Sequence, residues 1–61
     1  MHKFMRLNDV KAATGLSRSS IYGLIAQAKF PRQVLLCPGG RSVGWLFAEV
    51  EEYLEQRIAA R

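Results

Sequence analysis

The apolar residues of this chain change their spacing along its length, and each change predicts a new structural element. The first amphipathic run covers residues 8–14, with Leu7 in front of it and Gly15 behind it. Asn8 is a residue type that caps helix N-termini, and glycine commonly follows a helix C-terminus. We therefore expect a short first helix over residues 8–14, which Asn8 caps and Gly15 ends.

A second helix is predicted to begin after Ser17 and to run to about Ala28. Ser17 is expected to cap it by accepting a hydrogen bond from the backbone N–H of Ser19 or Ser20. Four apolar residues with the spacing i, i+3, i+4, i+7 form a stripe for the core: Ile21, Leu24, Ile25 and Ala28. The opposite face carries Arg18, Ser19, Tyr22, Gly23 and Ala26. We expect Leu16, in the turn between the two helices, to point into the core.

The next segment predicts a β-hairpin. Pro31 prevents the second helix from continuing, and Phe30 is expected to turn inward. Two β-prone runs, residues 34–37 and 42–45, flank a Pro-Gly-Gly-Arg sequence that favours a tight turn. We expect a short strand over residues 4–6 to pair with this hairpin.

The last helix is predicted over residues 47–60, where four apolar residues follow one another at intervals of 3, 4 and 4: Phe47, Val50, Leu54 and Ile58. The order of elements is therefore helix, turn, helix, hairpin, helix. This order predicts a mainly α fold with a small β-hairpin, the winged helix-turn-helix. In that fold the second helix can enter the major groove of DNA.

The length of the chain, its apolar runs and its content of cysteine and histidine limit the classes of function that it can have. The chain of 61 residues fits one small domain over residues 1–61. No apolar run approaches the roughly 20 residues of a membrane helix, and the start of the chain lacks the apolar stretch of a signal peptide. We expect a soluble, cytoplasmic protein without membrane contact. One cysteine, Cys37, and one histidine, His2, supply neither a disulfide framework nor a metal-ligand set.

Catalysis is not expected from these residues. The sequence lacks a carboxylate pair near a histidine, a phosphate-binding glycine loop and a Cys-His pair. We therefore predict no enzyme activity, no cofactor, no metal and no small-molecule substrate. Cys37 is interpreted as a small apolar filler of its strand, and Trp45 as a core residue.

Charge points to a polyanionic partner. The chain has 9 Lys and Arg against 5 Asp and Glu, a formal net charge of +4. The excess lies in residues 1–45, which hold seven basic residues and one acidic residue, a net charge of +6. Residues 46–61 hold four glutamates and two arginines, a net charge of −2. A basic surface over most of the chain favours double-stranded DNA as the partner.

Several sequence runs together resemble a known family: RLNDVKAATGLSRSSIYGLI, KFPRQV, GGRSVGW and EVEEYLEQRIAAR. They closely resemble the AlpA family of short prophage regulators over nearly the whole chain. The most specific stretches are residues 14–22, 29–31 and 39–45. The resemblance implies a MerR-like winged helix-turn-helix fold, like that of phage excisionases, and a transcriptional regulator of a mobile element that acts near an integrase gene.

Carried over by position, the resemblance implies DNA-binding residues on the second helix and on the hairpin tip: Ser17, Arg18, Ser19, Ser20, Tyr22 and Arg41. The residue types agree with that role. Arg18 in the first helical turn can reach a guanine edge or a phosphate, and Arg41 on a glycine-rich tip can reach the backbone or the minor groove. Ser17 as a purely structural cap, and Tyr22 as a cover for the edge of the core, remain the alternatives.

Lys29 and Arg32 flank Pro31, and both are candidates to hold the DNA backbone on either side of the groove. Lys3, Arg6 and Lys11 rank behind them. The family often carries a basic residue where this chain has Gly23, which also lowers helix propensity by about 1 kcal/mol relative to alanine. The large apolar pair Leu46 and Phe47 departs from the family pattern as well, and it suggests a surface for contact between protomers.

Three functional hypotheses stay open on the sequence. The first is a sequence-specific regulator whose copies bind adjacent or repeated sites. The second is an excisionase or recombination directionality factor that bends attachment-site DNA. The third is a protein-only adaptor that contacts a basic partner, such as an integrase or a polymerase subunit, through Glu49, Glu51, Glu52 and Glu55.

Overall fold

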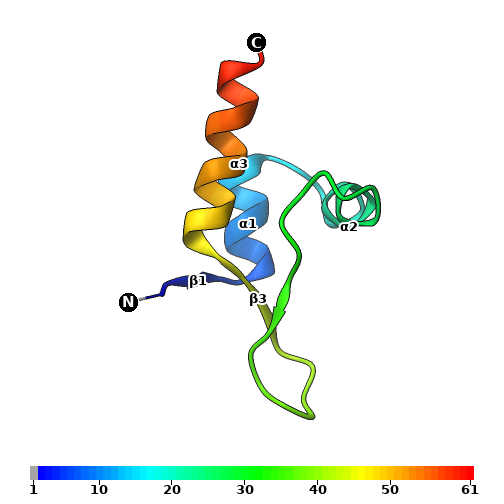
Figure 1. Ribbon diagram of the computed structural model, residues 1–61. Coiled ribbons are helices and arrows are strands. Elements are labelled where there is room, and N and C mark those ends of the chain that lie inside the picture. Colours follow the sequence, from blue (N-terminus) through cyan, green and yellow to red (C-terminus); the bar gives the residue numbers. More distant parts are fainter. Residues whose placement is uncertain (1) are drawn as a thin grey trace.

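The computed structural model describes residues 2–61, which form three helices and three short strands (Figure 1). In chain order these are β1 (Phe4–Met5), α1 (Leu7–Thr14), α2 (Arg18–Ala26), β2 (Val34–Leu35), β3 (Val43–Leu46) and α3 (Phe47–Ala59). The prediction of a mainly α fold with a small hairpin is confirmed at this level. None of the helices in the described part of the chain is long and apolar enough to span a membrane.

The three strands form one antiparallel sheet in the order β1-β3-β2. Met5 pairs with Trp45, and Leu35 pairs with Val43, so both the predicted N-terminal strand and the predicted hairpin are present. The hairpin turns where the Gly40 N–H donates to the Cys37 carbonyl at 2.9 Å. Gly39 has φ 78°, a conformation that favours glycine at the third position of a type II turn. The hairpin extends away from the helices, at the bottom of Figure 1.

Helix α1 begins earlier than its sequence pattern predicts. Its N-cap is Arg6, whose backbone N–H donates to the Asp9 carboxylate at 3.3 Å. The prediction that Asn8 caps this helix is therefore wrong: Asp9 supplies the acceptor, and Leu7 already lies in the first turn and packs against the core. The end is as predicted, since Gly15 has φ 73° and its N–H donates to the Lys11 carbonyl at 2.8 Å.

Helix α2 starts as predicted, because the Ser17 hydroxyl accepts a hydrogen bond from the Ser20 N–H at 3.2 Å. It ends at Ala26, two residues before the predicted end. Ala28 has φ 58°, its N–H donates to the Ile25 carbonyl at 2.9 Å, and the Lys29 N–H donates to the Leu24 carbonyl at 2.8 Å. These two bonds form a Schellman motif, which turns the chain so that Phe30 enters the core.

The core receives one buried side chain from each helix, one from β3 and one from the loop after α2: Val10, Ile21, Phe30, Trp45 and Val50. Trp45 is completely buried, and its indole Nε1–H donates to the Pro31 carbonyl at 3.0 Å. The Phe30 ring meets the Tyr53 ring edge-on, with 4.7 Å between the ring centres. The core roles predicted for Phe30 and Trp45 are confirmed.

The predicted core position of Ala28 is wrong, because Ala28 is exposed and lies beyond the end of α2. Both ends of the apolar series on α3 are exposed as well. Ile58 is 54% exposed, because the C-terminal half of α3 extends beyond the other elements (Figure 1). Phe47, at the start of α3, is 40% exposed, so only the middle of the predicted apolar stripe lies against the core. Cys37 is exposed at the start of the hairpin turn and does not fill space within the strand.

The left-handed conformation of Ala28 leads to a stability prediction. Glycine adopts positive φ without the steric cost that alanine carries, so Ala28→Gly should raise the free energy of unfolding by about 0.5–1 kcal/mol. Urea unfolding measures the difference. The control is Ala26→Gly in the last helical residue, which should lower the free energy of unfolding by a similar amount. A loss of stability in both variants would contradict the proposed cost at Ala28.

Candidate functional site

Three arginines from distant parts of the sequence meet around one hollow of the surface. Arg6 precedes α1, Arg18 is the first residue of α2, and Arg41 lies in the hairpin. They line a hollow of about 420 Å³ together with Leu7, Asn8, Tyr22 and Val43. The described residues that line it include no aspartate or glutamate. This concentration of positive charge makes the hollow, which we call the arginine hollow, the leading candidate for an anion-binding surface.

The apolar residues of the arginine hollow connect it to the core. Leu7, Tyr22 and Val43 are half-buried and pack against the core cluster. The Tyr22 ring meets the Trp45 ring edge-on, with 6.2 Å between the ring centres. The arginines therefore extend from a base that the core holds in place, which limits the freedom of a surface site.

Tyr22 also positions Arg18. The guanidinium carbon of Arg18 lies 5.6 Å from the centre of the Tyr22 ring, within the range of a cation–π contact. Tyr22 thus packs against the core cluster and also borders the arginine hollow. Its contact with DNA stays a prediction.

The three serines at the start of α2 have different surroundings. Ser17 accepts the capping bond of α2, and its hydroxyl also donates to the Ser20 hydroxyl at 3.0 Å, so these two side chains are engaged with one another. Ser20 borders a separate hollow with Leu16 and Leu24, on a different flank of α2 from the arginine hollow. Ser19 is exposed and does not line the arginine hollow.

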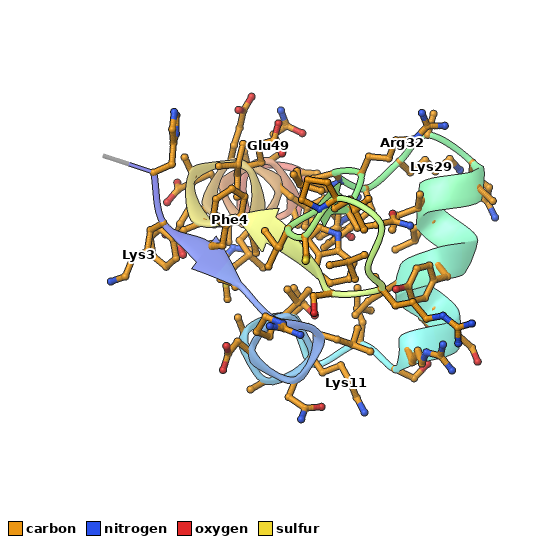
Figure 2. The ribbon with its side chains drawn as sticks, turned by 90° about the horizontal axis from the view of Figure 1, so that it is seen from below. Lys3, Phe4, Lys11, Lys29, Arg32 and Glu49 are labelled. Atoms are coloured by element: carbon orange, nitrogen blue, oxygen red, sulfur yellow. The ribbon has the colours of Figure 1, made fainter. Side chains whose placement is uncertain are left out.

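Lys29 and Arg32 lie together at the opposite end of α2 from Arg18 (Figure 2). Both side chains are exposed. Lys29 lines a hollow of about 310 Å³ whose other residues include Glu49 and Glu52, so positive and negative charges mix there. Lys29 also lines a second hollow, where Arg57 is the other charged residue. Basic residues therefore flank both ends of α2, and the N-terminal end is where three arginines line one hollow without an acidic residue among its described lining residues.

Sequence reasoning ranked Arg6 low and assigned Asn8 only to capping, whereas the structure brings both into the arginine hollow. A signal for Arg6 was available. The predicted strand over residues 4–6 pairs with the hairpin, and the Met5–Trp45 pair leaves Arg6 close to the strand that carries Val43. No comparable signal existed for Asn8, because its place depends on where α1 begins.

Among the residues that the structure describes, no group of three or more His, Cys, Asp and Glu side chains could hold a metal ion. His2 and Cys37 are both exposed, the first before β1 and the second in the hairpin turn.

Replacing the exposed arginines should leave the fold intact. Arg41→Ala should change the free energy of unfolding by less than about 0.5 kcal/mol, and Arg18→Ala should lower it by at most about 1 kcal/mol because the cation–π contact is lost. Thermal or urea unfolding measures both values. A loss of more than about 2 kcal/mol in either variant would show that the arginine supports the fold itself.

The amino-acid sequence of this chain is similar to a known protein family and to two known proteins. Residues 3–58 match the family model described as prophage CP4-57 regulatory protein (AlpA). The chain is 48% identical over 59 residues to the uncharacterized protein ORF88 of Enterobacteria phage P4, covering 97% of this chain and 65% of the length of that protein. It is 38% identical over 61 residues to the DNA-binding transcriptional activator AlpA of Escherichia coli K12, covering 90% of this chain and 84% of that protein. The chain therefore belongs to the AlpA family of prophage regulatory proteins.

Proposed function

We propose that this chain is a sequence-specific DNA-binding regulator of transcription from a prophage or another integrated element. The observation that carries the proposal is the arginine hollow, where Arg6, Arg18 and Arg41 meet without an acidic residue among the described lining residues. The Escherichia coli relative, named a DNA-binding transcriptional activator, supports the same assignment. Arginine is the side chain best suited to bind phosphates and guanine edges in two-pronged fashion.

In this proposal the fold acts as a winged helix-turn-helix. The three-residue turn, residues 15–17, joins α1 to α2, and the hairpin of β2 and β3 is the wing. Helix α2 enters the major groove, whose width of about 12 Å admits an α-helix. Arg18 then reads a base edge from the first turn of α2, and Arg41 follows the backbone or the minor groove.

The outer surface of α2 suits close approach to DNA. Ser19, Gly23 and Ala26 are exposed and small. A Cβ atom at Gly23 would meet no atom of the described chain within 4 Å, apart from its own helix backbone and chain neighbours. The fold therefore does not require glycine there. Without a basic residue at this position, the charges for DNA must come from the two ends of the helix.

The distribution of charge supports an orientation on DNA. The basic residues of the arginine hollow come from α1, α2 and the hairpin, whereas the glutamates lie along α3. Glu49 projects from the side of α3 that faces away from α1 (Figure 2). We therefore orient the α2 and hairpin surface toward DNA and the acidic side of α3 away from it. On that side α3 stays available to a basic protein partner such as an integrase or a polymerase subunit.

Binding by several copies is part of the proposal, because one small surface gives modest affinity. Phe4 is 43% exposed and Phe47 is 40% exposed. Strand pairing places Phe4 opposite Leu46, which directly precedes Phe47 at the start of α3. This apolar surface is available for contact between copies on adjacent sites. A target near an integrase gene, and an additional role in excision, follow from the family resemblance and require the same DNA contacts.

Fluorescence anisotropy tests the proposed function. With the region upstream of the nearest integrase gene as probe, binding should be tighter than to a scrambled duplex. With about five phosphate contacts, log K should fall with log salt at a slope of about −4 to −5 between roughly 50 and 200 mM salt. Absence of salt-dependent binding to either duplex would contradict the DNA-binding proposal and favour a protein-only adaptor.

Arg18 and Arg41 should differ in what they contribute to DNA binding. Arg41→Ala should weaken binding to the native and scrambled duplexes by the same factor and flatten the salt slope by about one, because a phosphate contact carries no sequence information. Arg18→Ala should weaken binding to the native duplex more than to the scrambled duplex, by roughly tenfold. If Arg18→Ala lowers the affinity for both duplexes by the same factor, Arg18 contacts the DNA backbone and not a base edge.

A further inference from the structure

We propose that the arginine hollow is a seat for one backbone phosphate of DNA, held jointly by Arg6, Arg41 and Asn8. This inference rests on the proposed function. It adds specific phosphate contacts for Arg6 and Asn8, and it assigns different DNA contacts to Arg18 and to Arg41. The N-terminal end of α1 and the hairpin hold the same phosphate between them, while Arg18, the first residue of α2, contacts the groove.

The charges in the arginine hollow are the first argument. Three arginine residues share the lining of one hollow, and no acidic residue is among the described lining residues. Like charges repel one another, and a bound anion offsets that repulsion. A phosphate is the anion that matches arginine best, because its oxygens accept paired N–H bonds from the planar guanidinium group.

The start of α1 supplies the second argument. Arg6 is the N-cap of α1, and Leu7 and Asn8 are its first two residues, so the lining of the hollow includes the N-terminal end of a helix. The first N–H groups of a helix have no partner within the helix, and they carry partial positive charge. Phosphates bind at such ends through these N–H groups. The Asn8 side-chain amide is a further donor beside them.

The one acidic residue of this turn does not line the arginine hollow. Asp9 accepts the Arg6 backbone N–H at 3.3 Å, and it is not among the residues that line the hollow. Its carboxylate is therefore engaged in capping α1. Arg6 therefore caps α1 through its backbone N–H and is also one of the residues that line the arginine hollow.

The pairing of β1 with β3 fixes the chain segments that carry Arg6 and Arg41 relative to each other. Met5 pairs with Trp45 across β1 and β3, and Trp45 is completely buried. Arg6 follows Met5 directly, while Val43, two residues before Trp45, lines the hollow beside Arg41. The chain segments that carry Arg6 and Arg41 thus leave the same strand pair. A phosphate between them would be held by a preformed frame, which reduces the entropy cost of binding.

The test uses a random-sequence duplex, because phosphate contacts do not depend on sequence. The salt slope of binding is measured for the unchanged protein, for Arg6→Gln, for Arg41→Ala and for the double variant. The matched control is Lys11→Gln, which removes one positive charge from the same helix. Lys11 is exposed, does not line the arginine hollow and projects from the outer side of α1 (Figure 2).

A shared phosphate predicts a specific pattern of slopes. Because the seat holds its phosphate only when both arginines are present, Arg6→Gln and Arg41→Ala should each flatten the slope by about 0.9. The double variant should also flatten it by about 0.9, because all three variants lose the same single phosphate contact. Lys11→Gln should leave the slope within about 0.3 of the unchanged protein. A flattening of about 1.8 in the double variant would overturn the shared seat, since it would show two separate phosphates. Equal salt slopes for Arg6→Gln and Lys11→Gln would show that Arg6 does not hold the phosphate.

Asn8→Asp separates DNA binding from folding. A carboxylate in the first turn of α1 favours the helix, so the Tm should rise or stay unchanged. The same carboxylate would repel a phosphate in the seat, so binding to the random duplex should weaken by roughly tenfold, well beyond the effect of Lys11→Gln. Equal weakening by both substitutions, which change the net charge by the same amount, would overturn the place of Asn8 in the seat.

Failure of this inference is distinguishable from failure of the proposed function. If the unchanged protein binds neither the native nor the random duplex, the DNA-binding function fails and the seat fails with it. If the unchanged protein binds with a steep salt slope while Arg6→Gln and Asn8→Asp behave like Lys11→Gln, the function stands and the seat alone is overturned.

Discussion

The burial of Trp45 is the interaction on which the rest of this small structure depends. Its indole N–H donates to the Pro31 carbonyl at 3.0 Å, which ties the loop after α2 to β3. Its backbone pairs with Met5 and so holds β1 in the sheet. Its ring meets Tyr22 of α2. Loss of a buried tryptophan side chain costs roughly 3–5 kcal/mol, which is a large part of the stability that a domain of this size has. Trp45 thus holds β1 through its backbone, and it holds α2 and the loop after α2 through its side chain.

The arginine hollow follows from this arrangement. Tyr22 contacts Trp45 on one side and Arg18 on the other, and Val43 precedes Trp45 on the same strand. The charged groups extend from residues that the core holds in place, although each arginine is itself exposed. A chain with few buried residues can therefore present an ordered basic surface. Arg18 is linked to the core through Tyr22 and Trp45.

Local patterns predicted much of this fold, because the features that define it are short-range. The Ser17 cap, the glycine after α1 and the Pro-Gly-Gly turn each act through neighbouring residues. Sequence patterns did not predict burial where it depends on packing between elements that are distant in the sequence. The spacing of Ile58 is that of a buried residue, but no other element reaches the end of α3 to cover it. The arginine hollow was only partly predictable: charge and family pattern selected Arg18 and Arg41, whereas Arg6 and Asn8 join them only through strand pairing and the true start of α1.

The central claim is that the surface around the arginine hollow is the one that DNA contacts. Nuclear magnetic resonance of the isotope-labelled chain, titrated with a duplex from the region upstream of the nearest integrase gene, tests it most directly. The account predicts that the largest shifts of backbone and arginine side-chain signals occur in residues 6–8, 18–23 and 41–43, while residues 51–59 of α3 change little. Shifts concentrated on the glutamates of α3, with the arginine hollow unaffected, would contradict the account.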